Sequence, residues 1–167
     1  TAVLDGYIKP VLGRYLLDLQ GGLEQNGFQG AFHVMRSGGG AMTVTEAKDA
    51  PLLTVLSGPA GGVVGTQYIA NETGRDNLIS PDTGGTSLDP GVFTEGRPSE
   101  VYEADIDHMP VLIPIFDIRT IGAGGGSIAW MDQDLLKVGP KSAGADPGPA
   151  CYDRGGENPT VTDAALV

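Results

Sequence analysis

The sequence predicts an α/β protein in which helices flank a mixed sheet, and three observations lead to this fold class. Apolar residues recur at helical spacing between Leu4 and Leu23. A second helical stretch begins near Pro59 and stops at Gly74, a pairing that is typical of helix ends. From residue 77 onward, short apolar runs alternate with turn residues, as they do in consecutive strands.

The first 75 residues read as a segment of helix, strand and helix. Pro10 lies inside the first helical pattern, so the helix either kinks there or begins near it. Residues 32–35 are predicted to form a buried strand, in which His33 packs in the core and binds no ligand. Residues 45–48 are predicted to form a short capped helix that precedes the second long one.

Three glycines, Gly61, Gly62 and Gly65, lie within two turns of the second long helix. Glycine is a poor helix former, by roughly 1 kcal/mol for each residue. Their clustering indicates the close approach of a neighbouring strand or helix. A phosphate bound at the N-terminus of the helix is the alternative explanation.

The second part of the chain is rich in predicted strands. They cover residues 77–80, 91–95, 100–105, 111–121, 127–131 and 135–138. The glycine run 122–126 either turns the strand 111–121 back into the strand 127–131, or it forms a backbone cradle near a nucleotide or substrate. Both interpretations remain open at this point.

Several polar residues have a structural explanation that competes with a functional one. Glu103, Asp105 and Asp107 alternate beside His108, so the three acids share one face of a strand. They could collect a cation, but a solvated edge that resists aggregation is the simpler interpretation. Cys151 has no CxxC motif or histidine cluster near it, so we expect a small buried residue and no zinc ligand.

The most informative segment is Asp82-Thr83-Gly84-Gly85-Thr86-Ser87-Leu88-Asp89, which follows the apolar pair Leu78-Ile79. Glycines let backbone N–H groups converge on an anion such as phosphate, and Thr86 adds a hydroxyl donor. Asp82 and Asp89 can hold a hydrated Mg²⁺, which prefers oxygen ligands and keeps several waters. A simple hairpin turn with glycine at its tip is the alternative.

Composition and charge exclude some classes of function. The formal net charge of −11 argues against nonspecific binding of nucleic acid or of an anionic membrane surface. No apolar run approaches the roughly 18 residues of a membrane-spanning helix, and no signal-peptide pattern is visible. The single cysteine cannot form an internal disulfide, so we expect a reducing, cytoplasmic location.

Several unusual strings, taken in order, resemble the hydantoinase A/5-oxoprolinase family, which also includes acetone and acetophenone carboxylase subunits. The strings are Ser57–Gly65, the Asp82–Asp89 segment, Thr120–Trp130, Val138–Tyr152 and Pro159–Ala164. The resemblance extends from about residue 31 to the C-terminus. The first helix is compatible with it but carries no motif.

The resemblance implies an actin-like ATPase fold, shared with sugar kinases and Hsp70, in which two α/β halves close on a nucleotide. It implies an enzyme that uses ATP and Mg²⁺ to activate an amide or carbonyl oxygen by phosphorylation. Ring opening of a hydantoin or 5-oxoproline, or carboxylation of a ketone, then follows. The implied partners are a cyclic amide or ketone and the rest of the enzyme or a hydantoinase B-like subunit, in a hetero-oligomer.

The resemblance also implies roles for individual residues. Gly84, Gly85 and Thr86 would hold the phosphates of ATP, Asp82 and Asp89 would act in catalysis and face the metal, and Gly124 and Gly125 are further candidate nucleotide contacts. These seven residues lie in the part from residue 76 to residue 167, which would begin the second half of the ATPase.

Residues 1–75 would end the first half of the ATPase. Family members are several-fold longer, and the sequence starts at Thr1 without Met. We therefore expect a fragment, an excised domain or a split subunit.

The hairpin departs from the family pattern Phe-Asp-Met-Gly-Gly-Thr-Ser-Thr-Asp-Val at four positions. Pro81, Thr83, Leu88 and Pro90 replace the Phe, the Met, the second Thr and the Val. Proline removes a sheet donor, so two prolines beside the turn challenge its strand pairing. The alternative function is accordingly a non-catalytic assembly subunit with a degenerate phosphate loop.

Overall fold

A computed structural model describes residues 1–106 and 109–167, which divide into two compact units. Unit 1 comprises Thr1–Leu78 and Val92–Asp117, and unit 2 comprises Ile79–Gly91 and Ile118–Val167. The predicted boundary after residue 75 falls near the first of these divisions, but residues 92–117 return to unit 1. The assignment of the two parts of the chain to two halves of an ATPase stays a prediction.

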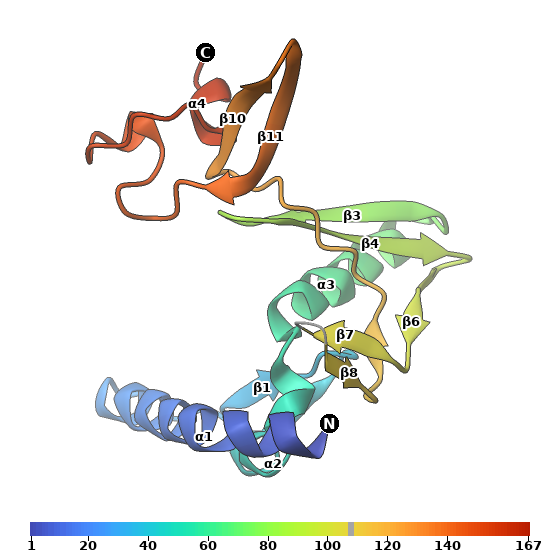
Figure 1. The fold of residues 1–167 in the computed structure, drawn as a ribbon. Coiled ribbons are helices and arrows are strands. Elements are labelled where there is room, and N and C mark those ends of the chain that lie inside the picture. Colours follow the sequence, from blue (N-terminus) through green and yellow to red (C-terminus); the bar gives the residue numbers. More distant parts are fainter. Residues whose placement is uncertain (107–108) are drawn as a thin grey trace. The chain divides into compact units, whose positions relative to one another are not determined.

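Unit 1 contains the long helices and several short strands (Figure 1). Its helices are α1 (Ala2–Gln25), α2 (Val44–Asp49), η1 (Pro51–Thr54) and α3 (Ser57–Thr73). Its strands are β1 (His33–Met35), β2 (Ala41–Thr43), β5 (Arg97–Pro98), β6 (Glu100–Val101), β7 (Ala104–Ile106), β8 (Met109–Val111) and β9 (Ile115–Phe116). The strand pairs β1–β2, β6–β9 and β7–β8 are antiparallel.

The predicted helices are confirmed, and their ends show why they form where they do. α1 runs through Pro10 without interruption. At the start of α2, the Thr43 hydroxyl accepts from the Glu46 N–H while the Glu46 carboxylate accepts from the Thr43 N–H. α3 ends at Gly74, whose φ of 64° lies in the left-handed region that glycine adopts without strain.

Two apolar clusters hold unit 1 together. The first gathers Leu52, Val111, Ile113 and Ile115, and Leu4 and Ile8 of α1 pack against it. The second gathers Leu16, Met42 and Ala47, which joins the middle of α1 to β2 and α2. The apolar residues that repeat along α1 therefore attach it to both clusters, as the helical spacing predicts.

Several expectations for unit 1 are wrong. The predicted strand 111–121 is interrupted after Val111, where Pro114 offers no N–H for a ladder. Ile115 and Phe116 form a short strand, and beyond it Ile118 and Ile121 form only isolated bridges, with Gly91 and Leu88. His33 is exposed and does not pack in the core. Asp105 lies in β7 as expected, but Asp107 and His108 lie outside the described residues, so the predicted acidic face stays a prediction.

The glycines of α3 also differ from the expectation of close approach. A β-carbon built on Gly61 or on Gly65 would meet no other atom of the described residues within 4 Å. No strand or helix of the described chain approaches α3 at these two glycines, whereas Ala60 and Val63 beside them are buried.

Unit 2 contains most of one hairpin, all of a second hairpin and a short C-terminal helix (Figure 1). The first hairpin is β3 (Leu78–Thr83) with β4 (Leu88–Thr94), and the second is β10 (Ser127–Asp132) with β11 (Leu135–Ser142). η2 (Ala150–Tyr152) and α4 (Val161–Ala164) follow. β4 continues into unit 1, where Phe93 and Thr94 pair with β5.

The α/β class is confirmed, with the described strands divided among small sheets where we expected one. The glycine run 122–126 does not turn one long strand back on itself, because β10 pairs with β11. Within residues 1–106 and 109–167, no helix combines the length and the hydropathy needed to cross a bilayer.

Candidate functional site

The Asp82–Asp89 segment forms the predicted hairpin of unit 2. β3 and β4 are neighbours in one sheet, and residues 84–87 connect them. The Gly84 N–H donates to the Ser87 carbonyl over 2.8 Å and closes the turn. Gly84, Gly85 and Thr86 are exposed, so the tip of the turn is open to a ligand.

The two prolines that replace family residues do not prevent this hairpin from forming. Pro81 lies inside β3 and Pro90 inside β4. The far edge of β4 is paired as well, because Leu88 and Ile121 exchange two backbone hydrogen bonds of 2.8 Å. The Arg119 N–H also donates to the Pro90 carbonyl. Each proline lacks an N–H but keeps a carbonyl acceptor, which is the group that Pro90 uses.

The glycine run 124–126 packs directly on the hairpin turn. The N–H groups of Gly124, Gly125 and Gly126 donate to the carbonyls of Thr86, Gly84 and Gly85 over 3.3, 2.9 and 2.6 Å. The N–H groups of Gly124 and Gly125 are thus already bonded within the chain. A direct contact between these two glycines and a nucleotide stays a prediction.

These bonds fix the direction of the peptide groups in the turn. The peptides that join residues 84 to 85 and 85 to 86 are trans, so each carbonyl points opposite to the N–H of the next residue. Because the carbonyls of Gly84 and Gly85 face the glycine run, the N–H groups of Gly85 and Thr86 face away from it. Neither N–H bonds to a described residue. The turn therefore presents two adjacent free donors on its open side.

Close contact explains why the run consists of glycine. A β-carbon on Gly124 would lie 2.5 Å from the Ser87 nitrogen and 2.7 Å from the Gly84 carbonyl oxygen. One on Gly126 would lie 2.9 Å from the Gly85 oxygen. On Gly85 itself it would meet nothing within 4 Å. The run needs glycine for packing, whereas the turn has empty space beside it.

Two hydroxyl residues support the glycine run from behind. Thr162 of α4 donates both its N–H and its hydroxyl to the Gly125 carbonyl, each over 2.8 Å. Ser127 is fully buried, and its hydroxyl reaches the carbonyls of Thr86 and Gly122 over 3.4 and 3.5 Å. Sequence reasoning did not predict this supporting role for either residue, although both lie in strings that carry the family resemblance, Thr120–Trp130 and Pro159–Ala164.

The two candidate carboxylates of the hairpin have different surroundings. Both oxygens of Asp89 accept hydrogen bonds, from the Ser87 hydroxyl over 2.9 Å and from the Thr120 hydroxyl over 2.6 Å. Asp82 is exposed and bonds to no described side chain. Asp89 thus ties the start of β4 to residue 120, and Asp82 is the carboxylate that is free to face a cation.

The polar groups of the hairpin are of the kinds that bind a phosphate together with Mg²⁺. Free backbone N–H groups and the Thr86 hydroxyl suit phosphate oxygens, and Asp82 offers a hard oxygen ligand. The described residues contain no group of three or more His, Cys, Asp or Glu side chains that could hold a metal ion. A Mg²⁺ here would be held by one or two carboxylates, water and phosphate oxygens, which is its usual mode in nucleotide sites.

A third carboxylate, Asp163, organises the segment that precedes α4. It accepts from the N–H groups of Cys151 and Thr160, both over 2.8 Å, and from the Thr160 hydroxyl. These bonds, above all the one from the Cys151 backbone, hold the Asp163 pKa well below its usual range. Asp163 thereby fastens η2 to the first turn of α4, the helix that holds Gly125.

Cys151 differs from the prediction of a small buried residue, since it is exposed. Its thiol hydrogen-bonds to the Asp163 carboxylate, which raises the pKa of the thiol. A raised pKa keeps the sulfur protonated at neutral pH, and the thiolate is the nucleophilic form of cysteine. Cys151 therefore has a structural role: its bonds to Asp163 help to hold the first turn of α4.

The sequence of this chain is similar to that of a known protein family. The family model for hydantoinase/oxoprolinase matches residues 1–167. The caprolactamase subunit alpha of Pseudomonas jessenii is 39% identical over 100% of this chain and 24% of that protein. The acetophenone carboxylase gamma subunit of Aromatoleum aromaticum is 38% identical over 100% of this chain and 23% of that protein.

Two solved structures share the fold. The ATP-dependent caprolactamase from Pseudomonas jessenii gives a TM-score of 0.76 at 37% identity, over 99% of this chain and 24% of that one. The nucleotide-free structure of acetone carboxylase, which carries out ATP-dependent carboxylation, gives 0.76 at 31%, over 90% of this chain and 21% of that one. The chain thus spans about a quarter or less of these relatives.

These likenesses confirm the predicted α/β class within an actin-like ATPase fold, and they confirm the resemblance to ATP-dependent amidohydrolases and carboxylases. The 167-residue chain belongs to the hydantoinase/oxoprolinase family.

Proposed function

We propose that this chain supplies a phosphate-binding hairpin to an ATP-dependent enzyme that activates an amide or carbonyl oxygen by phosphorylation. The observation that carries the proposal is the pair of free N–H groups on Gly85 and Thr86, which the bonds from Gly125 and Gly126 turn to the open side. ATP supplies the phosphoryl group, and the chain contributes positioning and charge stabilisation, on which phosphoryl transfer chiefly depends.

The residues of the hairpin divide this work. The N–H groups of Gly85 and Thr86 and the Thr86 hydroxyl hold phosphate oxygens. Asp82 orients Mg²⁺ through water. Asp89 contributes mainly by keeping the turn in register through its bonds to Ser87 and Thr120.

The proposal extends to the substrate and the assembly. A cyclic amide or a ketone would be the second substrate, because the relatives include a caprolactamase and two carboxylases. Two of these relatives are named as subunits, so we place the chain in a hetero-oligomer with a hydantoinase B-like partner.

The alternative function, an assembly subunit with a degenerate hairpin, rested on the two prolines at positions 81 and 90. Both lie inside strands of a hairpin that forms and is paired along its outer edge. This pairing favours the catalytic proposal over the alternative.

The test is ATP hydrolysis that depends on a cyclic amide or a ketone, measured in the assembled complex. Thr86→Ala removes one hydroxyl contact to the phosphate, so we expect the free energy of phosphate stabilisation to fall by roughly 0.5–3 kcal/mol. The rate of ATP hydrolysis should fall accordingly. Asp82→Asn should cost more, because it removes the charge that faces the metal. Thr94→Ala and Asp134→Asn are matched controls at exposed positions outside the site. Parental ATP turnover in both site variants would refute the phosphate-loop role and favour the assembly role.

A further inference from the structure

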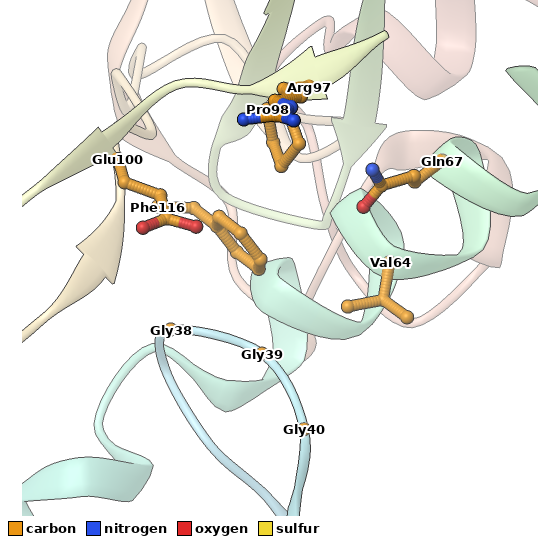
Figure 2. A pocket seen from close by; sticks show the side chains of 9 residues that line it. All are labelled: Gly38, Gly39, Gly40, Val64, Gln67, Arg97, Pro98, Glu100 and Phe116. Carbon is orange, nitrogen blue, oxygen red and sulfur yellow. The ribbon is translucent and has the colours of Figure 1, made fainter.

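Unit 1 contains a pocket of about 560 Å³ that the hairpin site does not involve. Figure 2 shows the glycine turn 38–40 on one side of it, Val64 and Gln67 of α3 on another, and Arg97 with Pro98 across from the turn. Phe116 and Glu100 complete the lining. All of these residues belong to unit 1.

The glycine turn keeps the base of this pocket open. Gly39 has a φ of 83°, and a β-carbon there would lie 2.9 Å from the Phe116 ring and 3.6 Å from a Val64 methyl. Ser37, just before the turn, is fully buried and bonded to the Leu53 carbonyl through both its N–H and its hydroxyl, each over 2.8 Å. The turn is therefore fixed against an apolar base formed by Phe116 and Val64.

The lining combines this apolar base with two opposite charges. Arg97 and Glu100 are exposed, and neither side chain forms an ion pair or a hydrogen bond with a described residue. The Gln67 amide group donates to the Gly96 carbonyl over 3.2 Å, which leaves its oxygen as an acceptor. A guanidinium binds a carboxylate through paired N–H donors, and a carboxylate accepts from an ammonium group.

We propose that this pocket binds a small zwitterion, a molecule with a carboxylate and an ammonium group joined by an apolar chain. Arg97 takes the carboxylate, Glu100 takes the ammonium group, and the carbon chain lies on Phe116 and Val64. Hydrolytic opening of a cyclic amide breaks the C–N bond and adds water, which leaves one carboxylate and one amine. The link to such a product rests on the proposed function, whereas the binding itself does not.

The test measures binding by calorimetry to the intact protein, with 6-aminohexanoate as the probe. Hexanoate and hexylamine carry one charge each, and we expect each to bind at least tenfold more weakly. Arg97→Gln and Glu100→Gln should each weaken binding of the zwitterion at least tenfold. Arg75→Gln and Glu72→Gln, at exposed positions outside the pocket, are matched controls that should bind as the parent does.

A charge exchange makes the test sharper. Arg97→Glu alone should abolish binding, and the double variant Arg97→Glu with Glu100→Arg should restore part of it, because the ligand can bind in reverse. Equal binding of all three probes, or parental binding by Arg97→Gln and Glu100→Gln, would overturn the proposal. Substrate-dependent ATP hydrolysis, measured on the same samples, reports separately on the hairpin function.

Discussion

At the scale of single residues, Gly124 and Gly85 differ in the space beside them: Gly124 packs tightly on the turn, and Gly85 has no atom nearby. Gly124→Ala forces a methyl group against the Ser87 nitrogen and the Gly84 oxygen, so we expect it to destabilise unit 2 by about 1–3 kcal/mol. Gly85→Ala has free space and should leave stability nearly unchanged while hindering nucleotide binding. Thermal unfolding and nucleotide titration of both variants separate the two effects. Equal stability of both variants would contradict the packing role of Gly124.

The thiol of Cys151 provides a second prediction at this scale. Because its hydrogen bond to Asp163 raises the thiol pKa, we expect alkylation by iodoacetamide to be slow at pH 8 despite the exposure of the residue. The rate should increase only at a higher pH than for an ordinary cysteine. Asp163→Asn removes the negative charge and should lower the pKa, which speeds the reaction at pH 8.

Asp146→Asn, a nearby exposed carboxylate, is the control for this reaction. It should leave the alkylation rate unchanged. Fast alkylation of the parent chain at pH 8 would show that the bond to Asp163 does not protect the thiol.

Residues of the site could be predicted where the signal is local. In the octet from Asp82 to Asp89, the Gly-Gly pair predicts the turn and the two acids predict the candidate site. These signals are visible because all of the residues lie within one hairpin. Ser127 bonds to Thr86, which lies 41 residues earlier, and Thr162 bonds to Gly125, which lies 37 residues earlier. No local pattern in the sequence encodes such contacts. Cys151 was misjudged because composition cannot distinguish a buried thiol from one that is bonded at the surface.

At the scale of elements, α3 offers a matched pair of glycines. Gly74→Ala places a side chain at a φ of 64° and should cost about 1 kcal/mol of stability. Gly65→Ala lies in the helix with no atom nearby, so the better helix propensity of alanine should add roughly 0.5–1 kcal/mol. Chemical denaturation of the isolated chain measures both changes. A loss of stability in Gly65→Ala would show that another surface covers this face of α3.

Helices were easier to predict than strands for a physical reason. α1 and α3 carry their signals locally, in apolar spacing and in terminal residues such as Gly74. The strand pairs between residues 97 and 121 depend on partners elsewhere, so a long apolar run did not reveal the break at Pro114. The sequence does not distinguish a turn from a cradle at the glycine run 122–126, because the hairpin on which the run packs lies far away in the sequence.

At the scale of the whole molecule, α1 carries a row of exposed apolar side chains. Val3, Tyr7 and Val11 recur every four residues and are 87%, 79% and 72% exposed. Such a row marks an interaction surface, so we expect the protein to occur in a stable complex with a partner subunit. Sedimentation of the co-expressed subunits should show this complex, and Val11→Glu should weaken it. A monodisperse monomer in the presence of the partner would contradict this expectation.

The support of the hairpin by Thr162 has a consequence for how the protein is made. On the ribosome, the turn at Gly84–Gly85 emerges long before Gly125, and Gly125 emerges 37 residues before Thr162. Domains fold as units during synthesis, and the bonds that direct the N–H groups of the turn need both later segments. A nascent chain that ends before α4 therefore has the residues of the turn and of the glycine run without the two bonds from Thr162 that hold Gly125.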